Sequence, residues 1–192
     1  MNIVLIGYRA CGKTAVGRLL SERLDWPFLD TDVLIEQRCG MTIRDIFADR
    51  AEEAFREMER RVIAEVAQLD KHILSTGGGA VLNEDNARAL KQRGLLIWLT
   101  ASPETIWQRI LADRPRLASR PDFDRARGFH DIQSTIEQRE PSYRRWADLI
   151  IDTDERSPDR IAEEIFMLVE SRLAESSTTD AEPTSDRGSC GQ

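Results

Sequence analysis

The sequence predicts an α/β protein in which helices cover both faces of a five-stranded parallel sheet. Five short apolar runs bounded by turn residues alternate with helical stretches, and they occupy 3–6, 27–29, 72–75, 95–99 and 149–151. Each run is continuously apolar rather than alternating, which is typical of strands buried on both faces of a parallel sheet. The alternation with helices therefore predicts a three-layer α/β sandwich.

Six helical stretches separate and follow these strands. The sequence predicts helices over 13–24, 44–69, 83–93, 103–111, 132–146 and 158–173. In the third, Asn83 is the expected N-cap and Gly94 the expected stop. The second is longer and more charged than a crossover between strands requires. It is either a solvated surface helix or part of an inserted substrate-binding segment.

Composition limits the class of protein. With 192 residues, of which 41% are hydrophobic, the chain can bury one sizeable core, and we expect one domain over 1–174. The polar stretch 175–192 is expected to be a disordered tail. A net charge of -7 argues against a nucleic-acid partner. Three cysteines without a CxxC pair, and a start without a basic leader or membrane span, predict reduced thiols and a cytoplasmic protein.

The segment "GYRACGKT", from Gly7 to Thr14, matches the phosphate-binding pattern G-x-x-x-x-G-K-[ST] between a buried strand and an amphipathic helix. Its glycines let backbone N–H groups turn toward a phosphate, and Lys13 can reach the outer phosphates of a nucleotide. Thr14 is expected to ligate Mg²⁺, and Cys11 serves as a small spacer. The residues expected to bind ATP here are Gly7, Ala10, Cys11, Gly12, Lys13, Thr14 and Ala15.

The rest of the chain narrows the class of nucleotide-binding protein. The guanine-reading pattern Asn-Lys-x-Asp of GTPases is absent, and the strand 72–75 ends without the acidic residue of motor and ring ATPases. The carboxylate near the metal is then Asp30, at the end of the second strand. A small chain with these features and an inserted helical segment points to a kinase for small molecules.

Three further features suggest an acceptor site. Arg56 and Glu59 lie three residues apart on one helix face, where the carboxylate can hold the guanidinium for a bidentate contact with an anion. The glycines 77–79 follow a strand and allow backbone amides to approach a ligand. Arg139 lies just before Pro141, where we expect the helix to be interrupted. Each feature alone is weak, but their order along the chain is informative.

Together these features resemble the shikimate kinase family. Over residues 1 to about 172 the matching segments, in the family's order and spacing, are "GYRACGKT", "DTD", "GMTIRDIF", "FREME", "TGGGAV", "RPRL", "REPSYRR" and "IDTDERSP". Gluconate and nucleoside monophosphate kinases share the first motif without the others. The resemblance implies a P-loop kinase with strand order 2-3-1-4-5. It also implies transfer of the γ-phosphate of ATP, with Mg²⁺, to the 3-hydroxyl of shikimate, on the route to chorismate and aromatic amino acids.

The resemblance also implies roles for single residues. Asp32 matches the acidic residue that binds the acceptor hydroxyl, and Asp30 the one that orients the water shell of Mg²⁺. Lys13, Asp32 and Arg114 are the expected catalytic residues, and Arg114 belongs to a lid over 112–127. The residues expected near shikimate are Asp32, Arg56, Glu59, Gly77, Gly78, Gly79 and Arg139, the two arginines holding its carboxylate. Those expected near ATP beyond the loop are Arg109, Arg114 and Arg156.

Several expectations remain open at this point. Ala10 replaces a loop glycine of many members, which is tolerable if its φ is negative, and Arg116 replaces an apolar lid residue. The stretch 28–37, "FLDTDVLIEQ", is a weak helix start, because Ile35 stands where a capping box needs Glu or Gln. The inserted substrate-binding segment is expected over about 31–62. The protein is expected to be a monomer. The alternatives are a kinase for another hydroxy acid such as gluconate, or a nucleotide-binding module without activity.

Overall fold

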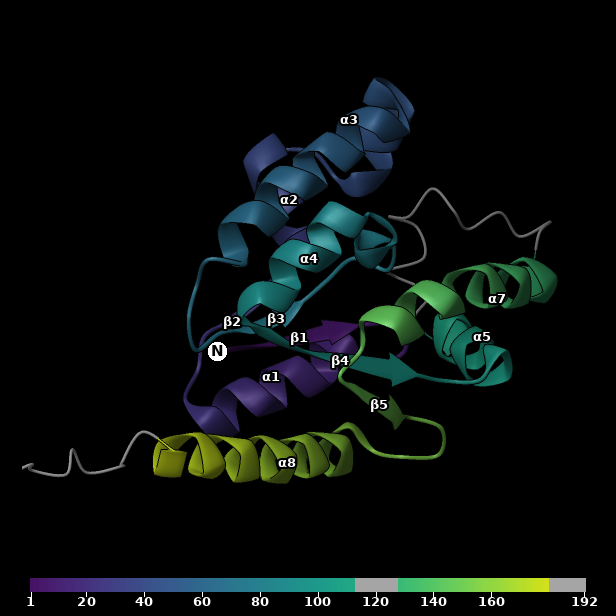
Figure 1. The fold of residues 1–192 in the computed structure, drawn as a ribbon. Helices are drawn as coiled ribbons and strands as arrows, with labels where there is room; N and C mark the ends of the chain where they lie inside the picture. Colours follow the sequence, from purple (N-terminus) through teal and green to yellow (C-terminus); the bar gives the residue numbers. More distant parts are fainter. Residues whose placement is uncertain (113–127, 180–192) are drawn as a thin grey trace, which may run out of the picture.

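The structure, a computed structural model, describes residues 1–112 and 128–179, apart from the side chains of 49–51 and 173–179. Five strands form one parallel sheet in the order β2-β3-β1-β4-β5 (Figure 1), which confirms the predicted class and order. The strands are β1 (Asn2–Ile6), β2 (Phe28–Asp30), β3 (Ile73–Ser75), β4 (Gly94–Thr100) and β5 (Leu149–Asp152).

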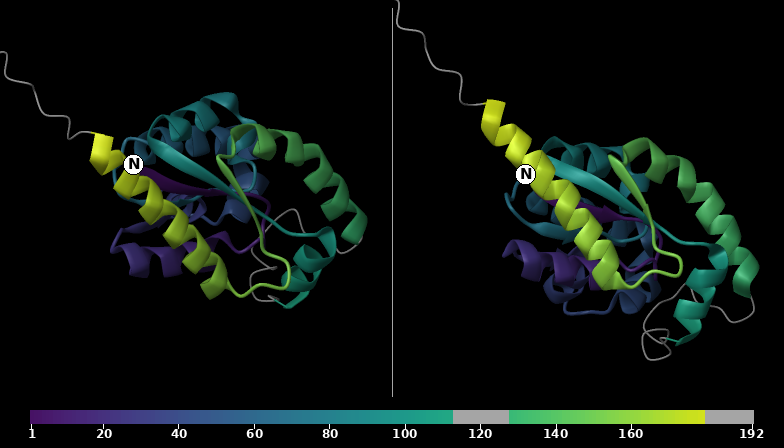
Figure 2. Two further views of the ribbon diagram at one scale, coloured as in Figure 1. Left: turned by 60° about the horizontal axis from the view of Figure 1, so that its bottom comes forward. Right: turned by 90° about the horizontal axis from the view of Figure 1, so that it is seen from below.

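Helices form the outer layers of the described fold. They are α1 (Lys13–Leu24), α2 (Thr31–Cys39), α3 (Ile43–Val66), the 3₁₀ turn η1 (Ala80–Leu82), α4 (Glu84–Arg93), α5 (Pro103–Ala112), α7 (Gly128–Trp146) and α8 (Pro158–Thr179). Figures 1 and 2 show α1 and α8 side by side on one face of the sheet and α3 and α4 on the other. Helices α5 and α7 lie beside each other near the carboxyl ends of the strands. This arrangement leaves those strand ends to form the site.

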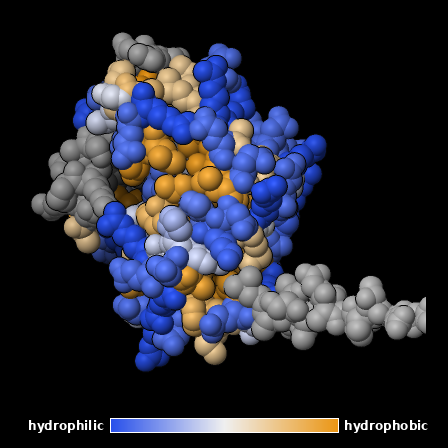
Figure 3. All heavy atoms as spheres, turned by 90° about the vertical axis from the view of Figure 1, so that its left-hand side faces the viewer, coloured by the Kyte–Doolittle hydropathy of each residue, from blue (hydrophilic) through white to orange (hydrophobic). Residues whose placement is uncertain are grey.

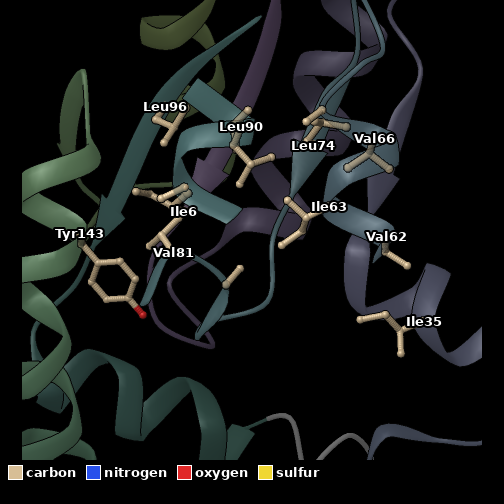
Figure 4. Packing of buried hydrophobic residues seen from close by; sticks show 14 of the residues in the cluster. Ile6, Ile35, Val62, Ile63, Val66, Leu74, Val81, Leu90, Leu96 and Tyr143 are labelled. Carbon is tan, nitrogen blue, oxygen red and sulfur yellow. The ribbon is translucent and has the colours of Figure 1, made fainter. Parts of the chain in front are cut away.

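Alternate residues of each central strand enter different hydrophobic clusters. In β1, Ile3 and Leu5 pack with residues of α1 and α8, whereas Val4 and Ile6 pack with residues of α3 and α4. Figure 4 shows Ile6 in the second cluster together with side chains from α3, α4 and α7. Because successive strand side chains point to opposite faces, a strand covered on both sides must be apolar throughout. The continuous runs in the sequence have this origin.

Helix α2 corrects one expectation. The stretch after Leu29 is a helix of nine residues that begins at Thr31, and its N-cap is Asp30. The Asp30 Oδ1 atom accepts a hydrogen bond from the backbone N–H of Asp32 at 3.1 Å. A single capping carboxylate is therefore sufficient here without the second half of a capping box. The following helix, α3, begins with Thr42 as its N-cap and ends at Val66 rather than at residue 69.

Helix α7 corrects a second expectation, because Pro141 lies inside the helix and does not interrupt it. A proline removes one backbone N–H and crowds the preceding turn, which costs about 3 kcal/mol in an isolated helix. Burial of Ile132 and Tyr143, which are only 2% and 1% exposed, fixes the helix on both sides of the proline. Tertiary packing therefore outweighs the local preference, and Arg139 lies on a continuous helix.

The carboxyl-terminal helix is longer than expected. Helix α8 ends at Thr179 rather than at residue 173, so it includes the first residues of the polar stretch. The face drawn in Figure 3 is mostly hydrophilic with an apolar area near its middle. No helix in the described ranges is long and apolar enough to cross a membrane. Most of the predicted lid, 113–127, and residues 180–192 lie outside the described part of the chain.

Candidate active site

The phosphate loop joins the buried end of β1 to the start of α1. Gly7 has φ 133° and Gly12 has φ 104°, conformations that residues with a side chain rarely adopt. A Cβ atom at Gly7 would lie 2.4 Å from the carbonyl oxygen of Leu99, on the neighbouring strand β4. Sheet packing therefore excludes any other residue at position 7. Cys11 is fully buried in the core and does not line the pocket described below.

Ala10 has φ 60°, so the condition for alanine to be tolerated without cost, a negative φ, is not met. The left-handed region costs an L-residue roughly 1 kcal/mol, which explains why a glycine fits this position better. The surrounding structure holds the conformation: the Arg109 guanidinium donates to the Ala10 carbonyl at 3.3 Å. The same side chain donates to the hydroxyl and the carbonyl of Thr153 at 3.0 and 2.7 Å. Arg109 thus connects the phosphate loop to the end of β5.

Lys13 lies beneath the phosphate loop and is 8% exposed. Its Nζ donates hydrogen bonds to the carbonyl oxygens of Gly7 and Tyr8, both at 2.8 Å. These neutral acceptors satisfy the ammonium group without neutralising it, so the loop carries a fixed positive charge. A bound phosphate would attract that charge more strongly than a carbonyl does, because ionised acceptors form the stronger hydrogen bonds.

Asp30 connects the two halves of the site. While its Oδ1 caps α2, its Oδ2 accepts hydrogen bonds from the hydroxyls of Thr14 and Ser75, both at 3.1 Å. Thr14 lies in the first turn of α1 and Ser75 ends β3, so one carboxylate ties together the phosphate loop and two adjacent strands. Ser75 was missed by sequence reasoning; its only signal was its place at the end of the strand before the glycines.

Asp32 lies in the first turn of α2 and faces the glycine turn after β3. A Cβ atom at Gly77 would lie 2.6 Å from the Asp32 Oδ1 atom and 3.2 Å from the Glu59 Oε1 atom. The Gly77 N–H donates to the Thr31 hydroxyl at 3.1 Å and fixes this turn against α2. Only glycine at position 77 leaves room for both carboxylates.

Glu59 is 1% exposed and holds the Arg56 side chain. Its Oε2 accepts from Arg56 Nη1 at 3.0 Å, while its Oε1 is buried without a hydrogen-bond partner among the described residues. Glu52 also accepts from Arg56, at 3.0 Å. Burial raises the pKa of Glu59, and the nearby charge of Asp32 raises it further, although Arg56 and Arg139 act in the opposite direction.

This raised pKa predicts a pH-dependent contribution of Glu59 to stability. The folded protein binds the Glu59 proton more tightly than the unfolded chain, whose ordinary value is 4.5. The contribution is therefore complete below pH 4.5 and is lost as the pH rises through the raised pKa. We therefore expect Glu59→Gln to gain stability relative to the parent protein as the pH rises from 4.5 through the raised pKa. Urea titrations at several pH values measure both free energies of unfolding.

Glu57 offers a matched control on the same helix. A hydrogen bond from Arg60 lowers the pKa of the exposed Glu57, and Arg61 acts in the same direction. Its contribution is present above pH 4.5 and is lost as the pH falls, so Glu57→Gln should show the opposite slope. A pH-independent difference between Glu59→Gln and the parent protein would contradict the prediction.

Tyr143 and Arg139 of α7 meet at the carbonyl oxygen of Gly78. Arg139 Nη1 donates to this oxygen at 3.3 Å, and the Tyr143 hydroxyl donates to it as well. Burial raises the pKa of the Tyr143 phenol, which therefore remains a donor. Its ring stacks on Trp98 with centroids 5.6 Å apart. Tyr143, labelled in Figure 4, was missed by sequence reasoning and carries only the signal of lying four residues after Arg139.

Gly79, the last of the residues predicted for the acceptor side, lies against Arg56. A Cβ atom at Gly79 would be 2.8 Å from Arg56 Nη1. Arg156, which was expected near ATP, has other contacts: its guanidinium donates to the Asp152 carbonyl at 3.1 Å and pairs with Glu164 of α8. Arg114 and Arg116 lie outside the described residues.

One pocket of about 280 Å³ joins the phosphate loop to Asp32. The predicted residues that line it are Ala10, Gly12, Lys13, Thr14, Ala15, Asp30, Asp32, Gly78 and Arg109. The residues that sequence reasoning did not place there are Arg9, Ser75, Thr76 and Ile110. Loop cations, an oxygen cluster around Asp30 and the Asp32 carboxylate thus surround one space. This is a geometry for transfer of a phosphoryl group to a hydroxyl.

Comparisons with known proteins agree with this geometry. The family model described as Shikimate kinase matches residues 9–170. Shikimate kinases of Symbiobacterium thermophilum and Syntrophus aciditrophicus are 44% and 45% identical to the chain, covering 90% and 89% of it and 98% and 92% of their own lengths. A shikimate kinase structure from Acinetobacter baumannii in complex with shikimate matches with TM-score 0.83 at 35% identity, covering 89% of this chain and 93% of that one.

A second class of solved structures shares the fold alone. A gluconokinase from Sinorhizobium meliloti covers 94% of this chain and 97% of its own, with TM-score 0.59 and 14% identity. At that identity the likeness carries no information about the acceptor.

Proposed function

The chain belongs to the shikimate kinase family, and on that premise we propose that its site transfers the γ-phosphate of ATP to the 3-hydroxyl of shikimate. The products are ADP and shikimate 3-phosphate. One observation carries the proposal: the carboxylate of Asp30 binds the hydroxyl of Thr14 on the nucleotide side and the backbone of Asp32 on the acceptor side. A donor phosphate and an acceptor hydroxyl are thereby brought to one pocket.

The nucleotide half would act through positioning and charge. We propose that Lys13 and the N–H groups of the phosphate loop bind the β- and γ-phosphates, since phosphoryl transfer needs little covalent help from the protein. Arg109 would hold the loop against the end of β5 and lie near the adenine, as its contacts with Ala10 and Thr153 suggest. Arg156 is a weaker candidate for the adenine side, because its guanidinium already pairs with Glu164.

The oxygens around Asp30 fit a magnesium ion. The hydroxyl oxygens of Thr14 and Ser75 both lie within hydrogen-bond distance of Asp30 Oδ2. All three atoms are hard oxygen ligands of the kind that Mg²⁺ prefers. We propose that Thr14 ligates the ion directly and that Asp30 orients its water molecules. Bound Mg²⁺ would neutralise charge on the β- and γ-phosphates.

The acceptor half would fix shikimate by its carboxylate and its hydroxyl. We propose that Arg56 and Arg139 bind the carboxylate beside Gly78 and Gly79, with Glu59 holding Arg56 in place. Asp32 would then accept a hydrogen bond from the 3-hydroxyl and aim it at the phosphate. From the family resemblance we also propose that Arg114 stabilises charge on the migrating group; this residue is outside the described structure.

The assay that tests this function measures ADP release with MgATP and a panel of acceptors. We expect ADP release to depend on shikimate and to stay at background with gluconate. Release with gluconate alone would make the protein a kinase of another hydroxy acid. Nucleotide binding without turnover on any acceptor would make it a binding module. We further propose that the protein is a cytoplasmic monomer. Light scattering at micromolar concentration tests the oligomeric state.

The Tyr143 hydroxyl is expected to strengthen the binding of shikimate, because it leaves Arg139 available for the substrate carboxylate. The Gly78 carbonyl accepts hydrogen bonds from both Arg139 and Tyr143. If Arg139 instead binds a substrate carboxylate, the Tyr143 hydroxyl is the donor that remains for this carbonyl. In Tyr143→Phe that carbonyl competes for Arg139, so we expect the KM for shikimate to rise about tenfold, the effect of one hydrogen bond worth about 1.4 kcal/mol. The KM for ATP should stay unchanged and serves as the internal control. An unchanged KM for shikimate in a fully folded variant would refute this role.

A further inference from the structure

Arg9 is a loop arginine that the proposed mechanism does not use. It is partly buried, and its Nε atom is buried without a hydrogen-bond partner among the described residues. The ion pairs of the described chain do not include it. A buried N–H of a guanidinium that finds no acceptor is costly. An anion that reached this atom would remove that cost.

The position of Arg9 is at the junction of the two halves of the site. It lines the pocket together with Lys13, Thr14 and Asp32. Its backbone nitrogen is 3.5 Å from the place that a Cβ atom would take at Gly78. Arg9, itself part of the phosphate loop, therefore also borders the glycine turn.

The charges around Arg9 favour an anion over a neutral group. The guanidinium carbon atoms of Arg9 and Arg139 both lie 5.6 Å from the centroid of the Tyr8 ring. The negative face of an aromatic ring compensates a cation only in part. Two guanidinium groups thus share one ring, and neither has an ion pair with a carboxylate in the described part of the chain. Of the two, Arg9 lines the pocket, where its charge can attract an anion.

We propose that Arg9 binds the phosphoryl group that is being transferred, and binds it most strongly as the phosphate monoester of the product. This inference rests on the proposed function. The γ-phosphorus leaves its bridging oxygen on ADP and bonds to the acceptor oxygen, whose proton passes to the Asp32 carboxylate. The group then moves from the side of Lys13 to the side of Asp32, within a pocket that Arg9 also lines. The planar guanidinium offers several donors to such a group.

The acceptor carboxylate is the less favoured ligand for Arg9. The arginines proposed for that carboxylate, Arg56 and Arg139, are not among the residues that line this pocket, whereas Arg9 lines it together with the phosphate-binding Lys13. The phosphate monoester also differs from shikimate only by the transferred group. A comparison of these two ligands therefore isolates the contact that Arg9 makes.

The test measures binding of shikimate 3-phosphate and of shikimate by titration calorimetry to the parent protein and to Arg9→Gln. We expect affinity for the phosphate monoester to fall at least tenfold in Arg9→Gln, with shikimate affinity changed by less than threefold and kcat lowered at least tenfold. Arg9→Lys keeps the charge but lacks the planar guanidinium. Its affinity for the phosphate monoester should lie between those of the parent protein and Arg9→Gln. Arg18→Gln, which removes an exposed arginine of α1 away from the pocket, should match the parent protein.

Two results overturn the inference. One is equal affinity of the parent protein and Arg9→Gln for the phosphate monoester. The other is an equal loss for shikimate and its phosphate, which would place Arg9 at the carboxylate. Failure of the proposed function looks different, because the parent protein itself would then show no shikimate-dependent ADP release. Thermal unfolding of each variant shows whether it is folded.

Discussion

Asp32→Asn is expected to lose most of its turnover, by about 10²- to 10⁴-fold, the range typical of removing a group that accepts a proton during reaction. Nucleotide binding should persist. The Asp32 carboxylate lies against Gly77 on the acceptor side, and it is the backbone N–H of Asp32, which the substitution keeps, that bonds Asp30. The oxygens around Asp30 therefore remain in place, and only the group that faces the hydroxyl changes.

The measurement combines steady-state kcat with calorimetric titration of ADP. Asp159→Asn, which removes an exposed carboxylate at the start of α8, controls for loss of one negative charge. If Asp32→Asn lost nucleotide affinity together with turnover, Asp32 would belong to the metal side of the site. Asparagine is nearly isosteric with aspartate, so a general loss of packing is not expected at this position.

Arg56→Ala should raise the KM for shikimate by about 100-fold, since a hydrogen-bonded contact between two charged groups is worth up to about 3 kcal/mol. The structure holds this guanidinium ready: Glu59 accepts from it at 3.0 Å, Glu52 accepts from its other end, and Gly79 leaves the space beside it. A preorganised donor loses little entropy when a carboxylate binds. The KM for ATP should remain within a factor of about three, because the loss of a contact made by one substrate leaves the other's contacts intact.

The control for Arg56 is a second arginine of α3. Arg61 is 73% exposed and pairs only with the exposed Glu57 in the described structure, so Arg61→Ala should leave both KM values unchanged. Arg56→Ala also leaves the buried Glu59 without its cation, which destabilises the fold as well. Arg56→Lys keeps that charge but cannot bind a carboxylate through two parallel donors, and it should still show a raised KM for shikimate. An unchanged KM in both variants would refute the assignment.

The layers of the fold follow from patterns that are local in sequence, whereas the order of the strands was implied by the family resemblance. Each strand is short, continuously apolar and bounded by polar turns, because both of its faces are covered. The phosphate loop is equally local, since its glycines, Lys13 and Thr14 lie within eight residues between a strand and a helix. Distant residues refine its shape: the Leu99 carbonyl lies beside Gly7, and Arg109 binds the Ala10 carbonyl. Such features are visible in the sequence without any knowledge of the tertiary structure.

Two local expectations were wrong for a shared reason. The pattern at 28–37 indicates only a weak helix start, and Pro141 is expected to interrupt a helix, yet both segments are continuous helix. The cap at Asp30 is strong because the same carboxylate also binds Thr14 and Ser75, from elements far away in sequence. Burial of Tyr143 likewise stabilises the turn beyond the proline. Propensities describe an isolated segment, whereas these segments are stabilised by their neighbours.

The sequence alone determined the fold class, the phosphate loop and the residue types of both halves of the site, because these depend on short patterns and on one family resemblance. Only the tertiary structure decided how those residues are held: the left-handed backbone of Ala10, the burial of Glu59 beside Asp32, and the position of Arg9 beside Gly78. These properties arise from contacts between residues that are distant along the chain, and a pattern of neighbouring residues does not encode such contacts.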